Sequence, residues 1–557
     1  MKKKFVFIFL ALALIPILAS CTYIRSLMNL AANKKEYPNK PITVNYYVDE
    51  EIYKTETTNK RKEFTYPANP SKDELNFGGW TYKESYQTLD PEDFLYDDVD
   101  SIDLYAYFSK GTHFSDNLAY NGPQISKGVL PSFGSPKVLV VPVDLGGNTT
   151  SAMIDNIEKA FSGDPEELGY ESVTSYYQKS SKGKLNLSFE VADTWFRPSK
   201  NASYYKDYNA STDKYNEAGS GLILHEFLEE NNSKYDFSDY DYDGDGYIDS
   251  VWMIYNVPQN YDNTVFYWAF VTMTLNNSKK YDNVSARYYG FASYYFMFEK
   301  EFETSQRQLE LYDMTNINID AHTYIHETGH LLGLDDYYDS DASKGPAGGI
   351  YTAGMMDANR GDLSSIDKLL LGWIDPYVIY TNSNKTITIN SFASSNDVIL
   401  VSRVKPSSIY SEYFLIDLYN TEGFVSQDNE IEEPSDIIKA DAMVHGKTYR
   451  NYGLRILHID ASLTNVYEGQ TYDEPVKFAY NNSNTKKLFV DTVLNNSSYA
   501  TQRINDINKR LMNYFGLYSL TGNYTLNYTM TNNTNIFFGI TINSISKDSA
   551  TITFNYN

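Results

Sequence analysis

The chain is poor in cysteine, in basic residues and in tryptophan. A single cysteine among 557 residues excludes any intrachain disulfide. Lysine and arginine number 47 against 72 aspartates and glutamates, and the resulting net charge of −25 disfavours binding to nucleic-acid phosphates, so no nucleic-acid partner is expected. Only five tryptophans accompany 52 tyrosines, a composition that favours β-rich extracellular modules over a compact cytosolic enzyme.

Long apolar runs are also missing, because no stretch after residue 21 reaches the ~18 apolar residues expected of a membrane-spanning helix. The N-terminus has three lysines and then the apolar run Phe5–Leu18, which is the order of an export signal. The run ends in Leu18-Ala19-Ser20-Cys21, which resembles the lipobox of bacterial lipoproteins. That resemblance implies cleavage before Cys21 and acylation of its thiol and its new amino group.

We therefore predict a lipoprotein signal peptide over residues 1–20 and a tether over 21–41 that is rich in Asn, Lys and Ala. Several acyl chains on Cys21, at ~0.8 kcal/mol per buried methylene, would hold the protein on a membrane without a spanning segment. The predicted location is the bacterial cell surface, outside the cytoplasm. The alternative is plain secretion with a free thiol.

Residues 42–110 alternate in the manner of short strands, expected over 44–48, 62–66 and 101–108. A Pro-rich turn (Pro67-Ala68-Asn69-Pro70) and the sequence Phe77-Gly78-Gly79-Trp80 lie between them. This order resembles the β-grasp repeat of bacterial surface proteins of the internalin B-repeat type. The resemblance implies a spacer or adhesion module without chemistry of its own.

The rest of the chain predicts a mixed α+β region followed by a strand-rich tail. A buried strand is expected over 137–143, and apolar periodicity predicts helices near 151–161, 165–180 and 215–230, with a strand over 184–191. After Pro376, turn-separated runs predict a β-sandwich-like region. Its expected strands cover 385–389, 397–404, 413–418, 454–459 and 536–556.

The sequence His326-Glu327-Thr328-Gly329-His330 carries the clearest chemical signal. On a helix of about 3.6 residues per turn, His326 and His330 project from one face and can both reach one zinc ion. Glu327 is then placed to act as general base toward a zinc-activated water. An ordinary helix with two surface histidines is the alternative for this short motif taken alone.

The residues that follow strengthen the zinc interpretation. Gly333 can adopt the left-handed conformation that ends a helix, so that the chain folds back and Asp336 supplies a third ligand. Asp335 and Asp339 are close neighbours, and the choice of Asp336 rests on spacing. His322 precedes His326 by one turn and is interpreted as a packing residue behind the site. The pattern resembles that of the metzincins, with Asp in place of their usual third His.

Downstream, Gly354-Met355-Met356-Asp357 resembles the second metzincin signature, a methionine turn below the metal ligands. We choose Met356 over Met355 as the apolar floor under the imidazoles. Two ordinary core methionines are the alternative.

Taken together, the segments from about residue 135 onward resemble the immune-inhibitor-A-like family of bacterial secreted metallopeptidases. His458 lies in a strand-like apolar run and is interpreted as structural. The segments that carry the resemblance, beside the zinc motif, are Val138–Val143, Ser175-Tyr176-Tyr177, Ser181-Lys182-Gly183-Lys184-Leu185, an acidic loop, Leu334–Asp339, Lys368–Trp373, Glu412–Leu415 and Gly453–Asp460.

The acidic loop has the ligand spacing of an EF-hand-type calcium loop. It places carboxylates at positions 1, 3, 5 and 9 and Gly246 at the sharp turn, while position 12 is Trp252 instead of Glu. We predict a structural calcium site, which the family resemblance also implies, against the alternative of a solvated acidic turn. Asp236 and Asp239 are further candidates for its shell. The predicted ligands are Asp241, Asp243, Asp245, the backbone carbonyl of Tyr247, and Asp249.

The predicted fold class is α+β: a metzincin-like zinc peptidase domain over 111–376, a β-grasp module over 42–110 before it and a β-rich domain over 377–557 after it. The predicted function is that of a surface-anchored zinc endopeptidase acting on extracellular proteins or peptides. Zinc is the expected catalytic metal and calcium the structural one, and a monomer is assumed. The alternatives are a non-catalytic adhesin that retains the peptidase fold, and a zinc hydrolase of non-peptide substrates.

Overall fold

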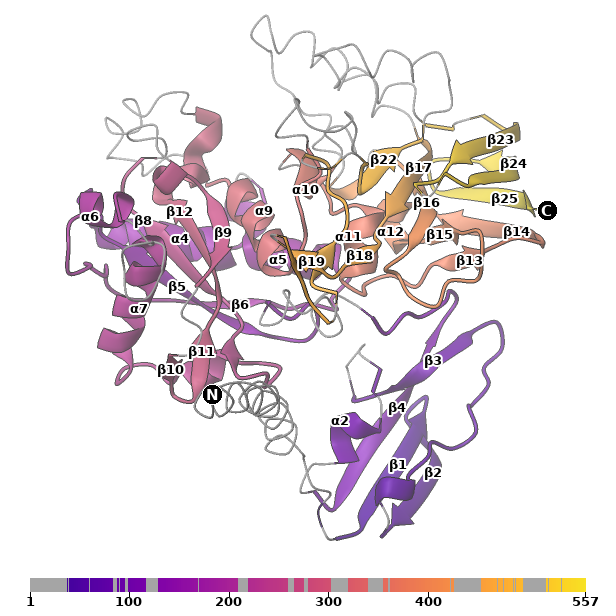
Figure 1. The fold of residues 1–557 in the computed structure, drawn as a ribbon, viewed down its shortest axis with the longest axis horizontal. Coiled ribbons are helices and arrows are strands. Elements are labelled where there is room, and N and C mark those ends of the chain that lie inside the picture. The colour runs from indigo at the N-terminus through magenta and orange to yellow at the C-terminus, as the bar shows by residue number, and fades with distance from the viewer. Residues whose placement is uncertain are drawn as a thin grey trace, which may run out of the picture. The chain divides into compact units, whose positions relative to one another are not determined.

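In the computed structural model, the chain divides into two compact units (Figure 1). The first unit comprises residues 1–73 and 79–108, and the second comprises 74–78 and 109–557. The described residues are 38, 40–59, 61–83, 88–89, 91–95, 99–116, 129–168, 170–208, 219–258, 265–274, 279–301, 319–338, 354–358, 361–420, 422–424, 452–467, 469–473, 475–483, 485, 487–493, 517–518, 520–531 and 533–556.

The first unit is a four-stranded sheet in the order β2-β1-β4-β3. Its strands are β1 (Ile42–Val48), β2 (Glu51–Thr58), β3 (Asn76–Thr81) and β4 (Ser101–Ser109). Strand β1 pairs antiparallel with β2 and parallel with β4. Alternate β1 residues, Ile42, Val44 and Tyr46, are fully buried, as period-2 alternation on a half-buried strand requires. Phe94, on the short helix α2 (Glu92–Leu95), is also buried.

The prediction of a strand over residues 62–66 is wrong. A 3₁₀ helix, η1 (Arg61–Glu63), begins there instead, and no strand follows up to residue 66. The guanidinium of Arg61 donates to the backbone carbonyls of Leu95 and Val99 at 2.8 and 2.9 Å. This buried side chain fixes the segment in a turn, a tertiary contact that local alternation cannot indicate. The predictions for 44–48 and 101–108 are confirmed by β1 and β4.

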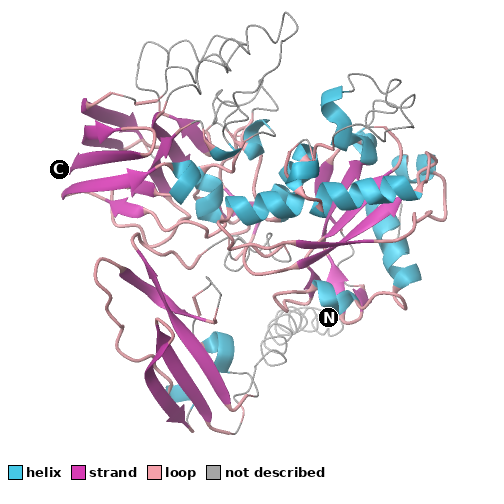
Figure 2. Ribbon diagram, turned by 180° about the vertical axis from the view of Figure 1, so that it is seen from behind, coloured by secondary structure: helices cyan, strands magenta, loops and turns pink. Residues whose placement is uncertain are grey.

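The second unit contains a five-stranded sheet in the order β6-β5-β8-β12-β9. Strand β5 is parallel to β6 and β8, β12 is parallel to β8, and β9 forms the antiparallel end of the sheet. Figure 2 shows the larger helices gathered in this part of the unit. The strands are β5 (Lys137–Val143), β6 (Ser188–Val191), β8 (Val251–Tyr255), β9 (Phe270–Met273) and β12 (Tyr288–Ser293).

The larger helices of this part are α4 (Ser151–Ser162), α5 (Val173–Ser180), α7 (Gly219–Asn231) and α9 (His322–Leu331), and α9 carries the candidate site. The predicted helix over 151–161 is confirmed by α4. The helix predicted over 165–180 is divided, because the Ser172 side chain caps α5 as a separate helix and only the 3₁₀ turn η3 (Pro165–Glu167) precedes it. The strand predicted over 184–191 is shorter than expected, since β6 begins at Ser188.

Among its described residues, the C-terminal part contains two two-stranded sheets, β18 (Leu463–Thr464) with β21 (Lys477–Phe478) and β19 (Val466–Tyr467) with β20 (Gln470–Thr471), and a five-stranded and a four-stranded sheet that share a core. Phe414 and Ile456 from the first sheet and Phe538 and Ile552 from the second are all fully buried in it. The run predicted over 536–556 is a hairpin of two strands. The first sheet, in order, is β13 (Tyr377–Ile379), β15 (Val398–Val401), β16 (Glu412–Tyr419), β17 (Gly453–Asp460) and β22 (Val490–Thr492); the second is β14 (Ser383–Asn390), β25 (Ser549–Tyr556), β24 (Asn535–Ile545) and β23 (Gly522–Thr529).

A hydrogen bond to a buried ion pair of the first sheet joins this β-rich part to the helical part. Arg455 on β17 donates to both carboxylate oxygens of Asp417 on β16, and Ser365 on α11 (Ser365–Leu370) donates to the same carboxylate at 2.8 Å. Because all three groups are buried and satisfied, they fix α11 against the first sheet.

The described residues thus form a mixed α+β protein, as predicted. None of their helices is long and apolar enough to cross a bilayer. The remaining elements are α6 (Ala202–Lys206), α10 (Met355–Ala358), α12 (Phe392–Ser395), η5 (Phe237–Tyr240), η6 (Val265–Tyr267), η7 (Tyr294–Glu301), β7 (Tyr247–Ile248), β10 (Lys280–Tyr281) and β11 (Val284–Ala286).

Candidate metal centres

Helix α9 carries the two histidines, and its C-terminal end returns the chain toward them. Gly333 has φ of +93°, and its N–H donates to the His330 carbonyl at 2.9 Å. The Leu334 N–H donates to the Gly329 carbonyl at 3.0 Å. These two bonds form a Schellman motif, whose left-handed residue is most easily a glycine. The motif reverses the chain direction directly before Asp336.

Two backbone carbonyls fix how the imidazoles face. The Nδ1 atom of His326 lies 2.8 Å from the Met355 carbonyl oxygen, and Nδ1 of His330 lies 2.8 Å from the Leu334 carbonyl oxygen. A carbonyl only accepts, so each neutral ring carries its proton on Nδ1 and leaves a lone pair on Nε2. This is the arrangement by which proteins orient metal-binding histidines.

The carboxylate of Asp336 lies close to the Nε2 atoms of both histidines. Its Oδ1 atom lies 3.1 Å from Nε2 of His326 and 3.3 Å from Nε2 of His330, yet this buried oxygen has no hydrogen-bond partner among the described residues. Two lone pairs and an anionic oxygen this close repel one another unless a cation lies between them. The donor set of two imidazoles and one carboxylate is one that zinc accepts, so these residues fit the ion.

The pKa values at the site follow from the same crowding. Burial favours the neutral form of Asp336, but the two imidazoles outweigh it and hold the pKa of the carboxyl well below its usual range. Burial alone would lower the pKa of His330, whereas Asp336 and Glu327 raise it to about 10. A proton can therefore satisfy the cluster when no metal is bound, and metal binding must release it.

Glu327 lies beside the ligands and is largely shielded from solvent. The residue is 7% exposed. Burial raises the pKa of its carboxyl, and the charges of His330 and His326 offset only part of that increase. A carboxylate with a raised pKa is a better proton acceptor near neutral pH than an exposed one.

The methionine turn lies against the same helix. A Cβ atom added to Gly329 would stand 2.4 Å from Sδ of Met356, so this thioether fills the space beside the helix turn between the two histidines. Met355 contributes its carbonyl to His326, and the Met356 carbonyl accepts from the Tyr337 N–H at 3.0 Å. Both methionines are fully buried. The turn thus positions one ligand and the loop that carries another.

Asn482 and Asp367 also hold the ligand loop, and no sequence pattern predicted either residue. Asn482 is buried and donates to the Tyr337 carbonyl at 2.9 Å, while the Tyr337 hydroxyl donates to Asp367 at 2.5 Å. Asn482 lies 145 positions after Tyr337, so only the tertiary fold brings them together. Their contacts restrain the residue next to Asp336.

The other predicted neighbours occupy different positions. Asp335 is exposed and does not join the ligand cluster, and Asp339 lies outside the described residues. His322 pairs with Asp320 and stacks on the Tyr170 ring, with ring centroids 3.9 Å apart. His458 lies on β17, where its Nε2 atom is 2.9 Å from Glu412. Cys21 and the segments 1–20 and 21–37 also lie outside the described residues.

The acidic loop brings three of its carboxylates together. Oxygens of Asp241, Asp243 and Asp249 lie within 4.8 Å of one another, whereas Asp245 is not part of this group and uses its carboxylate to accept from the Tyr247 N–H at 2.9 Å. The turn is formed by Gly244 and Gly246, whose φ angles are +72° and +89°. The predicted ligand at the Tyr247 carbonyl remains a prediction.

The electrostatics of this loop also favour a cation. Burial, together with the neighbouring carboxylates, raises the pKa of Asp249 to about 9 and that of Asp243 to about 6. Oδ1 of Asp241 is buried without a hydrogen-bond partner among the described residues. The three carboxylates therefore fit a calcium ion, which prefers such oxygen ligands. Asp236 instead caps η5 through the Ser238 N–H.

Position 12 of the loop connects it to the first site. Trp252 is fully buried on β8, and its Nε1 donates to Thr328 of helix α9 at 3.3 Å. Thr328 lies between the two histidines in sequence. Position 12 therefore serves the core that supports α9 and has no role as a metal ligand.

Asp336→Asn is expected to lower zinc affinity at least about 100-fold, because it removes the anionic oxygen that faces both Nε2 lone pairs. The measurement is a competition titration of the purified chain against a chromophoric zinc chelator. Asp335→Asn is the matched control and should bind zinc like the wild type. A loss of affinity in the Asp335 variant alone would contradict the ligand assignment.

Gly329→Ala should lower the free energy of unfolding by about 1–3 kcal/mol through overpacking against Met356, although alanine is otherwise the better helix former. Urea unfolding of Gly329→Ala, Met356→Ala and the double variant measures this. Because the second substitution makes room for the added methyl, the two effects should be non-additive. If the two changes in the free energy of unfolding simply add, the methyl group added at position 329 does not contact the Met356 side chain.

Calcium at about 100 times its dissociation constant should raise the free energy of unfolding of the wild type by about 2.7 kcal/mol. Thermal unfolding with and without calcium measures this increase. Asp241→Asn should abolish most of it. Asp239→Asn, on an exposed neighbouring residue outside the cluster, should retain it. Equal gains in both variants would argue that calcium binds elsewhere.

A search against models of known protein families finds no match, and a search of curated proteins finds none either. The chemistry of the two centres therefore has to be inferred from the residues that form them.

Proposed function

We propose that the chain is a zinc-dependent endopeptidase of the immune-inhibitor-A-like, metzincin type. The supporting observation is the convergence of two oriented imidazoles and the unpartnered Asp336 oxygen, with Glu327 beside them. A bound zinc ion would polarise the scissile carbonyl and lower the pKa of the attacking water. The flanking modules are proposed to be β-grasp-like and β-sandwich-like, on a protein anchored to the cell surface through Cys21.

Glu327 performs the proton transfers in this proposal. Its buried carboxylate accepts the proton of the attacking water and then gives it to the leaving amine, so one group serves both halves of the hydrolysis. The raised pKa of this carboxyl favours the second transfer, because a weaker acid than water-exposed glutamate retains the proton until the amine departs. His326 and His330 keep their Nδ1 protons on backbone carbonyls and do not exchange them during the reaction.

Strand β9 provides a surface for an extended substrate. It is the terminal strand of the five-stranded sheet, pairs antiparallel with β12 and contacts helix α9. An end strand offers backbone donors and acceptors to a peptide that adds to the sheet. Such a peptide would run beside the helix that carries the metal ligands, which favours a peptide over a small non-peptide substrate.

Glu327→Gln is expected to reduce the rate of casein cleavage by about 10²–10⁴-fold, because the amide cannot accept the proton of water. Zinc content, measured by elemental analysis, should stay near one per chain. Wild-type cleavage should stop on addition of a chelator and return with zinc. Cleavage that survives complete metal removal, or no cleavage by a zinc-loaded wild type, would overturn the proposal in favour of a binding protein.

A further inference from the structure

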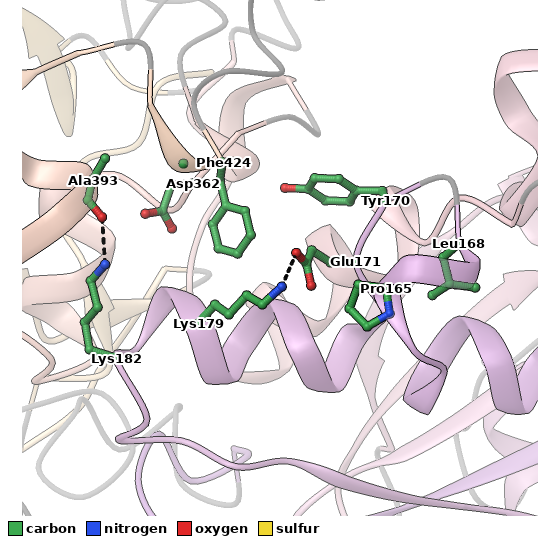
Figure 3. A pocket seen from close by; sticks show the side chains of 10 residues that line it. Pro165, Leu168, Tyr170, Glu171, Lys179, Lys182, Asp362, Ala393 and Phe424 are labelled. Atoms are coloured by element: carbon green, nitrogen blue, oxygen red, sulfur yellow. Dashed lines mark hydrogen bonds and ion pairs between the residues drawn. The ribbon is translucent and has the colours of Figure 1, made fainter.

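A cavity of about 500 Å³ lies in the second unit beside α5, with an aromatic wall and several charged groups (Figure 3). Tyr170 and Phe424 form the wall, with ring centroids 6.1 Å apart in an edge-to-face arrangement. Pro165, Leu168 and Ala393 add apolar surface. A volume of this size is typical of sites that take a small ligand or one or two residues of a peptide.

Most charges of the lining are neutralised within the protein. Glu171 and Lys179 form an ion pair at 2.6 Å, and the Asp362 carboxylate accepts from the buried Lys368 at 2.7 Å and from Ser180 at 2.5 Å. Lys182 differs from them, because its Nζ donates to the neutral carbonyl of Ala393 at 2.7 Å and has no carboxylate within ion-pair distance among the described residues. Figure 3 shows this lysine reaching toward Ala393.

Lys182 is therefore a lining cation that no carboxylate of the described residues neutralises, in a protein whose overall charge is −25. A carboxylate entering it would replace a neutral acceptor of Lys182 with an anionic one, and a charge-assisted hydrogen bond is stronger than a neutral one. The methylene groups of such a side chain would lie against Tyr170 and Phe424. The lining thus suits a short acidic group better than a basic one.

The cavity wall is connected to the candidate zinc site through two hydrogen bonds. The backbone carbonyl of Asp362 accepts from the Met355 N–H at 3.1 Å, and the Met355 carbonyl accepts from His326. On the other side, the Tyr170 ring stacks on His322, the first residue of helix α9. Two lining residues of the cavity therefore contact the helix that carries the ligands and the turn that orients His326.

We propose that this cavity receives an acidic side chain of the peptide substrate, with Lys182 as the partner of its carboxylate. The inference rests on the proposed peptidase function and adds a substrate class to it: the enzyme selects peptides with Glu or Asp at one position near the cleaved bond. Lys182 is thereby a specificity-determining residue.

The test is a cleavage profile of the zinc-loaded full chain on a peptide library with amidated C-termini. The wild type should favour Glu over Gln about tenfold at one position relative to the cut, as expected of a hydrogen bond to a charged group. Lys182→Met should bring this ratio close to one, and Lys182→Glu should favour Lys or Arg there. Lys159→Met, on an exposed lysine of α4 outside the cavity, should keep the wild-type ratio.

Lys182 has φ of +57°, and both of its variants keep a β-carbon, so neither changes the backbone strain at this position. Cleavage without any acidic preference, or a preference that survives Lys182→Met, would overturn the specificity and leave the peptidase function standing. A preference that appears only in peptides with free C-termini would assign the cavity to a terminal carboxylate and also overturn it.

If the zinc-loaded wild type cleaves no peptide, the proposed peptidase function is wrong. The proposed acid-binding role of the cavity is then tested by peptide binding. Fluorescence anisotropy of labelled Glu- and Gln-containing peptides then compares the wild type with Lys182→Met. Tighter binding of the Glu peptide that is lost in the variant supports an acid-binding cavity. Equal binding of the two peptides rejects it.

Discussion

The chemistry of the second unit depends on one close contact: the Asp336 oxygen lies 3.1 and 3.3 Å from the Nε2 atoms of two imidazoles whose Nδ1 atoms face backbone carbonyls. The Schellman turn at Gly333 creates this contact, and the anchoring of Tyr337 by Asn482 and Asp367 maintains it. Folding brings these lone pairs together at an electrostatic cost that only a proton or a metal ion offsets. The surrounding residues are therefore best understood as supports for a cation-binding geometry.

The acidic loop also brings potential metal ligands close together, and here all of them are hard carboxylate oxygens. Burial and the neighbouring carboxylates raise the pKa of Asp243 and Asp249, and strand β8 then carries the next residues directly to the helix with the histidines. Trp252 is the point where the two centres share structure, because it ends the loop pattern and also contacts Thr328. Order in the loop therefore contributes to the placement of α9, although no ligand is common to both sites.

Local spacing could predict the helix with His326 and His330, the glycine that ends it and the return of Asp336, because each depends on residues within a few positions. Strands such as β5, β16 and β17 followed from their apolar runs for the same reason. The contacts of Asn482 with the ligand loop and of Arg61 with distant carbonyls could not be predicted, since they join residues far apart in sequence. The division of the 165–180 helix at Ser172 depended on a cap that apolar periodicity does not register.

Net charge and local charge act on a substrate at different ranges. At physiological ionic strength the field of exposed charges is screened beyond about 8 Å, so the overall −25 affects how a substrate approaches more than which side chain it inserts. In the cavity beside α5, Glu171 pairs with Lys179 and Asp362 pairs with Lys368, and Lys182 has no carboxylate within ion-pair distance among the described residues. An acidic protein can therefore select an acidic side chain, provided that the rest of the substrate is not strongly anionic.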